Sequence, residues 1–249
     1  MTVTLGEAFP WSAEAYPRSA AYSRDWVVEN LMGPNALWLI EWLTQVLALE
    51  PGMRVLDLGC GKGLTSVFLA REFGVEVWAT DLWIGATANL KQFASEGVER
   101  RVFPIYAEAH ALPFAHGFFD AIVSIDAYHY FGTDDLYLSY LAPLLKQGGQ
   151  IGIVVPGFVR EVEALPEHLA PYWDPAFWSF HTPAWWRRHW ERSGLVAVTH
   201  ADNVPDGSRD WEAWLAGADP ATRAFHEYEM VRTDAGRTLG FTRVVATRC

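Results

Sequence analysis

Apolar and polar positions alternate in a regular way between residues 50 and 156, where short apolar runs are separated by amphipathic segments. This pattern is typical of a parallel sheet whose strands are joined by crossover helices. It predicts strands over 54–58, 75–80, 102–107, 120–125 and 150–155, with Pro156-Gly157 closing the last. It predicts helices over 64–73 and 84–97, and a third helix that begins near Thr133 and ends at Gly148-Gly149.

The flanking segments have a different character. Before the core, residues 22–31 and 35–49 predict two helices broken at Gly33-Pro34. Residues 158–181 are rich in Pro, Trp and Phe without a clear period, and we expect them to form an insertion over the sheet. Thr182-Pro183 is typical of a helix start, with Thr182 as the N-cap. The remaining pattern predicts a strand over 195–200, a helix over 210–216 and a final strand over 238–247.

No internal repeat or low-complexity linker divides the 249 residues, so we expect one cooperative domain over 1–249. Its parts are a helical N-terminal lid (1–49), a ligand-binding core (50–156), a cap insertion (157–181) and a segment that completes the sheet (182–249).

Composition excludes several classes of protein. The chain is 51% hydrophobic and carries a net charge of -11, which favours a globular protein that a phosphate backbone repels. We therefore expect no nucleic-acid partner. Cys60 and Cys249 do not form a disulfide framework, and the sequence shows no signal peptide, membrane span or basic amphipathic helix. A cytoplasmic location without stable membrane association is expected.

Tryptophan is unevenly distributed. Of 13 tryptophans, only Trp78 and Trp83 lie between residues 49 and 156. The others either line an apolar or cationic pocket as a lid or pack peripheral helices onto the core. Trp173 and Trp178, in the irregular insertion, are the better lid candidates.

The glycine-rich turn at residues 59–63 carries the strongest chemical signal, because it joins a buried strand to a helix. Glycines at such a junction let the backbone approach a ligand closely. The dinucleotide fingerprint fits poorly: the third glycine comes one residue early, position 64 is Leu64, and Asp57 is foreign to that pattern. A nicotinamide-dependent oxidoreductase is therefore disfavoured, and a generic strand-to-helix turn remains an alternative. Asp57 suits a ligand with an amino group, directly or through water.

Residues 55–63 resemble motif I of the class I S-adenosylmethionine-dependent methyltransferases, and further landmarks of that family follow in order up to Leu144–Gly149. The resemblance implies a Rossmann-like, seven-stranded, mostly parallel sheet with an antiparallel last strand, helices on both faces, N-terminal helices and an aromatic-rich cap. It also implies S-adenosyl-L-methionine as cofactor and methyl transfer to a small-molecule acceptor. By position, the region of Tyr16 and Tyr22 is expected to close over the cofactor.

The resemblance also assigns cofactor-binding positions. Asp81 would accept hydrogen bonds from both ribose hydroxyls, Leu82 would pack on the adenine, and Trp83 would either extend that wall or belong to the core. Glu108 would accept from the adenine amino group, although the family more often has Asp there. The full expected set is Asp57, Gly59, Cys60, Gly61, Gly63, Asp81, Leu82, Trp83, Glu108, Ala109 and Ser124.

Three residues after the strand at 120–125 are candidate catalytic groups: Asp126, Tyr128 and His129. His129 is the first candidate for a general base, since histidine titrates near neutral pH. Its other interpretation is that it caps the strand or packs. Asp126 and Tyr128 share a face only if the strand continues. The scattered histidines show no metal-ligand spacing, so no metal is expected.

Two alternatives to small-molecule methyl transfer stay open. One is a protein that binds S-adenosylmethionine or S-adenosylhomocysteine without catalysis, and the other is a methyltransferase acting on a lipid or quinone. The sequence leaves the acceptor, the accepting atom and the oligomeric state undetermined.

Overall fold

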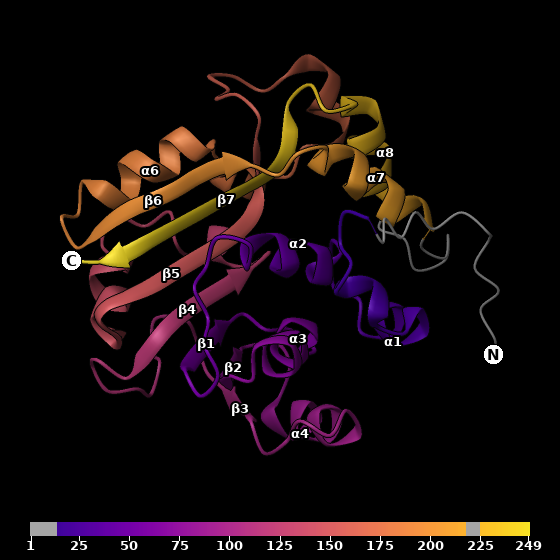
Figure 1. Ribbon diagram of the computed structural model, residues 1–249. Coiled ribbons are helices and arrows are strands. Elements are labelled where there is room, and N and C mark those ends of the chain that lie inside the picture. Colours follow the sequence, from indigo (N-terminus) through magenta and orange to yellow (C-terminus); the bar gives the residue numbers. More distant parts are fainter. Residues whose placement is uncertain (1–13, 218–224) are drawn as a thin grey trace.

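The computed structural model describes residues 14–217 and 225–249 (Figure 1). The described residues form one seven-stranded sheet in the order β3-β2-β1-β4-β5-β7-β6, in which β7 is antiparallel to both of its neighbours. The strands are β1 (Arg54–Leu58), β2 (Glu76–Asp81), β3 (Val102–Tyr106), β4 (Phe119–Ile125), β5 (Leu145–Phe158), β6 (Val196–Asn203) and β7 (Leu239–Arg248). This confirms the expected Rossmann-like sheet.

Helices cover both faces of the sheet (Figure 1). They are α1 (Arg24–Glu29), α2 (Ala36–Leu43), α3 (Leu64–Phe73), α4 (Ala86–Ser95), α5 (Tyr137–Leu141), α6 (Pro183–Glu191), α7 (Gly207–Gly217) and α8 (Phe225–Asp234). Single-turn or short 3-10 helices lie at Ser19–Ala21, Tyr128–Tyr130, Ala142–Leu144, Glu167–Tyr172 and Pro175–Ser179.

The core consists of two hydrophobic layers, one on each face. Alternate residues of a strand point to opposite faces, so Val55 joins the layer with α2 and α3, while Leu56 joins the layer with α5 and α6. Trp186 and Trp190 are fully buried in the second layer. These two tryptophans therefore attach α6 to the sheet.

Local sequence signals explain where several helices begin. The Asn35 side chain accepts hydrogen bonds from two amides of the first turn of α2, directly after Gly33-Pro34. The Thr182 hydroxyl accepts from Trp185 N at 3.2 Å, and Pro183 is the first residue of α6. Both N-caps agree with the pattern of the sequence.

One predicted helix and one predicted strand end are wrong. The helix expected from Thr133 to residue 147 is reduced to α5 and a 3-10 turn, and Thr133 caps nothing. Pro143 ends the helix, and Gly148-Gly149 continues into β5 through a register shift against β4. Pro156-Gly157 does not close β5, because beyond Val154 the strand pairs only with β7 and Pro156 needs no second ladder bond.

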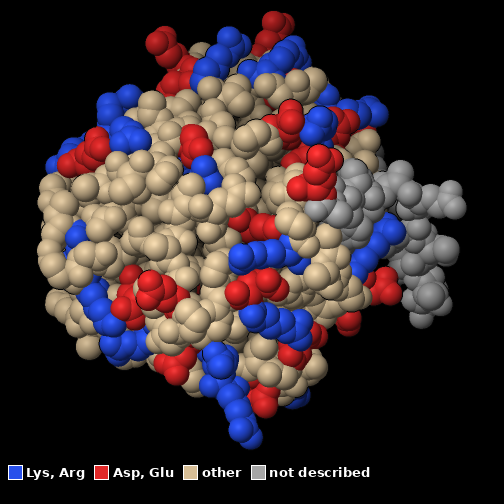
Figure 2. Space-filling view, in the orientation of Figure 1, with Lys and Arg blue, Asp and Glu red and all other residues tan. Residues whose placement is uncertain are grey.

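Other differences concern boundaries and one missed helix. The N-terminal helices are shorter than expected, and α8 was not predicted. Trp11, one of the aromatic residues of the predicted lid, lies outside the described residues, as do the rest of 1–13 and 218–224. Within the described ranges, no helix has the length and apolar character needed to cross a membrane. Figure 2 shows Lys, Arg, Asp and Glu side chains intermixed over the described part of one face.

Candidate active site

A first cavity of about 240 Å³ lies at the carboxyl ends of the parallel strands. Loops after β1, β2, β3 and β4 line it, because parallel strands bring these ends to one edge of the sheet. Residues 30 and 32–34, between α1 and α2, form another part of its wall.

The glycine turn after β1 forms one side of this cavity through Gly59, Cys60 and Gly61. Gly59 has φ +78°, and a Cβ there would lie 2.4 Å from Ala127 Cβ. Only glycine satisfies both the backbone angle and this close approach of two loops. Burial raises the pKa of the Cys60 thiol well above its usual value, so Cys60 stays protonated and contributes shape to the cavity.

Asp81, the last residue of β2, organises the same turn. Its Oδ2 accepts a hydrogen bond from Gly61 N at 2.8 Å, and its Oδ1 accepts from Trp83 N at 2.7 Å and Ile84 N at 2.8 Å. A carboxylate has about four lone-pair sites, so about one remains for a ligand. The Asp81 carboxylate could therefore accept hydrogen bonds from two ligand hydroxyls only if one of the three amides gave up its own hydrogen bond.

The loops after β2 and β3 supply the outer wall. Leu82 and Trp83 line the cavity with 46% and 71% of their surfaces exposed, which leaves apolar area for a ligand to cover. Glu108 and Ala109 line it too. Glu108 Oε1 lies 2.7 Å from His110 Nδ1, and this contact lowers the pKa of Glu108, so the side chain is an acceptor.

Three of the expected cofactor-binding residues lie outside the cavity. Ser124 Oγ donates to Leu58 O at 2.7 Å and ties β4 to β1. Gly63 begins α3 and faces the Phe93 ring. Asp57 is fully buried, and its Oδ2 accepts from Thr65 Oγ1 at 2.5 Å and Ser66 Oγ at 2.6 Å. These residues shape the turn beneath the cavity.

Asp57 should make folding stability depend on pH. Burial raises its pKa from 3.8 to about 6, so the folded state binds this proton more tightly than the unfolded state. The free energy of unfolding therefore falls as pH rises from about 4 to about 6, by up to ~3 kcal/mol. In Asp57→Asn this contribution disappears, and the variant should gain stability relative to the wild type between pH 4 and pH 7. Urea unfolding at both pH values checks this, and an offset independent of pH would contradict it.

The N-terminal segment does reach the cavity, but through different residues than expected. Met32, Gly33 and Pro34 line it, while Tyr16 and Tyr22 pack in the core. Tyr16 OH donates to Asp210 Oδ2 at 2.9 Å, and Tyr22 OH donates to Glu72 Oε1 at 3.1 Å. The two tyrosines thus anchor the segment that places 32–34 over the sheet edge.

A second cavity, of about 530 Å³, adjoins the first. The two share lining residues Met32, Gly33, Pro34, Asp126 and Tyr130. The cap insertion, α7 and α8 line the rest of the second cavity with aromatic side chains and carboxyl groups. A ligand in one cavity therefore borders a ligand in the other across this shared wall.

Asp126 occupies the shared wall in a strained conformation. It follows β4 directly and has φ +56°, in the left-handed region, where aspartate is tolerated better than most residues. Gly33 packs on it so closely that a Cβ at Gly33 would meet Asp126 Oδ2 at 2.4 Å. Burial and the nearby Glu227 carboxylate raise the pKa of Asp126 well above its usual value. Backbone strain of this kind is common at functional sites.

The other two catalytic candidates diverge. His129 lines the second cavity, its Nδ1 is buried without a partner among the described residues, and burial lowers its pKa to about 3. Tyr128 lies in neither cavity, because the strand ends at Ile125 and a 3-10 turn directs its ring into the core against Trp186 and Trp190. The expectation that Tyr128 faces the reaction space is wrong.

The cap insertion brings further aromatic residues to the second cavity. Trp173 lines it and contacts Phe177, with ring centroids 5.6 Å apart. Trp178 does not line it but packs on Trp173 at 4.9 Å. Of the two tryptophans expected in a lid, one lines the cavity and the other supports it.

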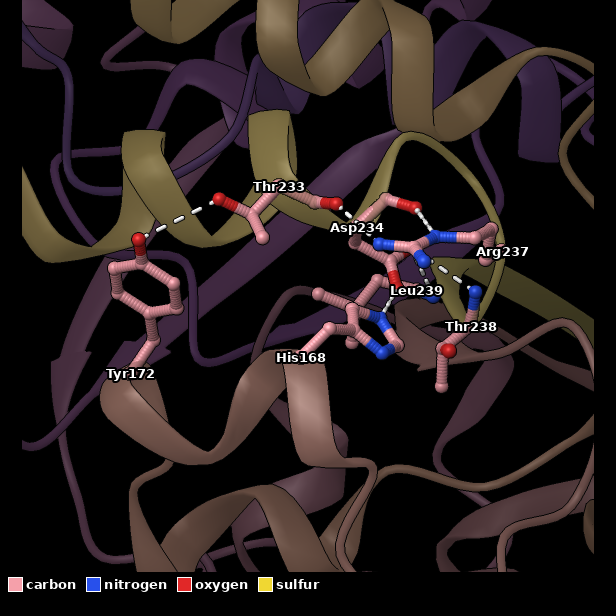
Figure 3. A network of polar contacts seen from close by, with 7 residues as sticks. All are labelled: His168, Tyr172, Thr233, Asp234, Arg237, Thr238 and Leu239. Carbon is pink, nitrogen blue, oxygen red and sulfur yellow. Dashed lines mark hydrogen bonds and ion pairs between the residues drawn. The ribbon is translucent and has the colours of Figure 1, made fainter.

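A buried polar network attaches the cap to α8 (Figure 3). Asp234 is fully buried, and its Oδ2 accepts from Thr238 N at 3.0 Å and Leu239 N at 2.8 Å. Its Oδ1 lies 2.8 Å from His168 Nε2 in the cap. Because Glu227 and Met230 of α8 line the second cavity, this network determines the position of that wall.

Asp234→Ala should lower the free energy of unfolding by about 3 kcal/mol, since it leaves two buried amides without acceptors. Chemical denaturation measures this. Glu191→Ala, which removes an exposed pair with Arg187 on α6, is the matched control and should cost less than ~0.5 kcal/mol. Equal stabilities of the two variants would contradict the role of the network.

Glu227 and Gly33 are among the site residues that the sequence analysis missed. Glu227 comes from α8, and its Oε1 accepts from Trp211 Nε1 at 2.8 Å. Gly33 was identified only as a helix break, although its carbonyl accepts from Trp214 Nε1 at 2.9 Å and holds the shared wall. The doublet Met230-Val231 before Gly236 was the available signal for α8. Over the described ranges, no group of three or more His, Cys, Asp or Glu side chains could hold a metal ion.

The first cavity fits S-adenosylmethionine in three respects. The glycine turn exposes backbone at Gly59 and Gly61, Asp81 keeps about one acceptor site for a hydroxyl, and Leu82 with Trp83 offers an apolar surface for a flat ring. The dinucleotide fingerprint fits the same turn poorly, because position 64 is Leu64.

Comparisons with known proteins support the same cofactor. The family described as a methyltransferase domain matches residues 55–149. A methyltransferase of Streptomyces halstedii, GfsG, is 33% identical over 132 residues, which are 50% of this chain and 46% of that protein. The chain spans about half the length of the curated relatives it matches.

Solved structures share the fold. The geranyl diphosphate C-methyltransferase of Streptomyces coelicolor, crystallised with S-adenosyl-L-homocysteine, aligns with a TM-score of 0.66 at 18% identity over 84% of this chain and 78% of that one. The [4+2]-cyclase SpnF aligns with a TM-score of 0.64 at 17% identity over the same shares. The same fold is therefore found in a methyltransferase and in a cyclase.

Proposed function

Because the chain belongs to the class I S-adenosylmethionine-dependent methyltransferases, we propose that it transfers a methyl group from that cofactor to a small molecule. The observation that carries the proposal is the wall shared by the two cavities. A donor in the first cavity and an acceptor in the second would meet at Gly33 and Asp126. This arrangement supplies proximity and alignment, which are the main protein contributions to such a reaction.

The residues of the first cavity would hold the cofactor. The turn at 59–61 would bind the amino-acid end of the cofactor, and Asp81 would accept a hydrogen bond from a ribose hydroxyl. The adenine would pack against Leu82 and Trp83, with Glu108 and Ala109 near the edge of its ring. Asp57, Gly63 and Ser124 would act indirectly by shaping the turn. When bound, the cofactor supplies a sulfonium-activated methyl group, whose carbon takes the acceptor's lone pair while the electrons of the broken C–S bond stay on sulfur.

The chain's own groups would exclude water and receive a proton where the acceptor must lose one. His129 is a weak base with its pKa lowered to about 3. Asp126 has a raised pKa and lies in the shared wall, so it holds an acceptor proton more readily. We therefore place Asp126 first and assign His129 to shaping and hydrogen bonding in the acceptor cavity.

Fold alone does not establish methyl transfer, since one structural neighbour is a [4+2]-cyclase. The test is formation of S-adenosylhomocysteine from S-adenosylmethionine with a panel of amines, alcohols, thiols, quinols and fatty acids. Product that depends on one acceptor class supports the proposal. Tight binding of S-adenosylhomocysteine without product from any acceptor would favour the non-catalytic binding protein instead.

The proposal includes a small-molecule partner, no nucleic-acid partner, no stable membrane association and a cytoplasmic location. The net charge of -11 supports the exclusion of nucleic acid. Filter binding with duplex DNA at low salt checks this, and retention of the DNA would contradict it.

A further inference from the structure

The second cavity combines carboxyl groups with aromatic walls. Asp126, Asp174 and Glu227 line it, and no Lys or Arg is among its described lining residues. The aromatic part includes Trp173, Phe177 and Phe180, with Phe177 and Phe180 stacked at 5.0 Å. Aromatic faces and carboxylates both attract a cation, whereas an anionic ligand would meet repulsion here.

The carboxyl groups of this cavity lack cationic partners. Among the described residues, no hydrogen bond or ion pair engages the Asp126 side chain, and Glu227 is held only by the Trp211 indole. Burial raises the pKa of both groups, and for Asp126 the charge of Glu227 adds to the effect. Two desolvated carboxyl groups in one cavity disfavour joint ionisation unless a cation joins them.

The His129 imidazole is a third polar group of this cavity, independent of the carboxyl groups. His129 is only 2% exposed, and its Nδ1 has no partner among the described residues. Its ring lies 4.1 Å from that of Tyr130, which belongs to the shared wall. A buried and unpaired nitrogen beside a cavity is explained most simply by a polar ligand that completes its hydrogen bonding.

We propose that the second cavity binds a protonated amine between Asp126 and Glu227, with its apolar substituent against the aromatic residues of the cap. This inference rests on the proposed function, because it names the class of the methyl acceptor. The ammonium nitrogen must free its lone pair before it accepts a methyl group. One N–H proton therefore passes to the Asp126 carboxylate and the N–H electron pair stays on nitrogen.

The test uses the full chain saturated with S-adenosylhomocysteine, titrated calorimetrically with benzylamine and with benzyl alcohol as its neutral counterpart. Benzylamine should bind at least 10-fold more tightly than benzyl alcohol. Glu227→Gln should weaken benzylamine binding by about 10-fold and leave S-adenosylhomocysteine affinity unchanged, because Glu227 lines only the second cavity. Glu229→Gln, on the same helix and paired with Arg232, is the matched control and should bind benzylamine like the wild type.

The outcomes separate the two proposals. If S-adenosylhomocysteine binds but the amine and the alcohol bind equally, or Glu227→Gln binds benzylamine as the wild type does, the amine assignment is overturned and the proposed function stands. If S-adenosylhomocysteine itself does not bind to folded protein, the proposed function fails, and the acceptor assignment fails with it.

Discussion

Replacing Asp81 by alanine is expected to weaken S-adenosylhomocysteine binding by about 100-fold. A ligand hydroxyl bound to a carboxylate contributes about 1.5–3 kcal/mol, which corresponds to roughly 10- to 150-fold in affinity. The structure adds a second cost, because Gly61, Trp83 and Ile84 lose the acceptor of their amides and the cavity wall loosens. The expected effect therefore lies toward the upper end of this range.

Calorimetric titration of the variant measures the effect, beside circular dichroism to establish folding. Asp81→Asn keeps one acceptor oxygen without the charge and should fall between the wild type and the alanine variant. If folded Asp81→Ala bound the ligand within about 3-fold of the wild type, Asp81 would have no part in the cofactor site.

Asp126→Asn should lower kcat by about 100-fold or more with an acceptor that must lose a proton, since positioned general bases contribute roughly 10²- to 10⁴-fold. Asparagine accepts the left-handed backbone conformation at φ +56°, so the substitution removes the proton acceptor while the shared wall is kept. His129→Ala should lower kcat by only about 10-fold, because the imidazole shapes the cavity and, with its lowered pKa, stays neutral near pH 7.

Initial rates at saturating S-adenosylmethionine, with the acceptor found in the panel, compare the two variants. A larger loss in His129→Ala than in Asp126→Asn would reverse the assignment and restore His129 as the base. An unchanged kcat in Asp126→Asn would show that no base at this position takes part.

The sheet could be predicted because its strands carry strong local signals. The run at Arg54–Leu58 is buried on both faces and precedes the glycine turn, so both its type and its boundaries were correct. The helix after Thr133 is shorter than predicted because Pro143 ends it after the five residues of α5, and because β5 already begins at Leu145, which pairs with Phe119 of β4. Local periodicity does not encode that pairing.

The two cavities also differ in how far the sequence predicts them. The wall residues Asp81, Leu82 and Glu108 follow strands in a fixed order, so their meeting at one edge follows from the parallel sheet. The acceptor cavity depends on contacts between distant segments, such as Gly33 with Trp214 and His168 with Asp234. Tyr128 could face the same side as Asp126 only if the strand continued beyond Ile125, and the backbone instead turns at Asp126.

A crystal structure of the protein with S-adenosylhomocysteine tests most directly whether one cavity holds the cofactor and delivers a methyl group to the other. We expect density for the ligand in the first cavity, with the ribose at Asp81, the adenine at Leu82 and Trp83, and the sulfur facing the wall of Gly33 and Asp126. Density elsewhere, or a sulfur directed away from the second cavity, would contradict the proposed methyl transfer.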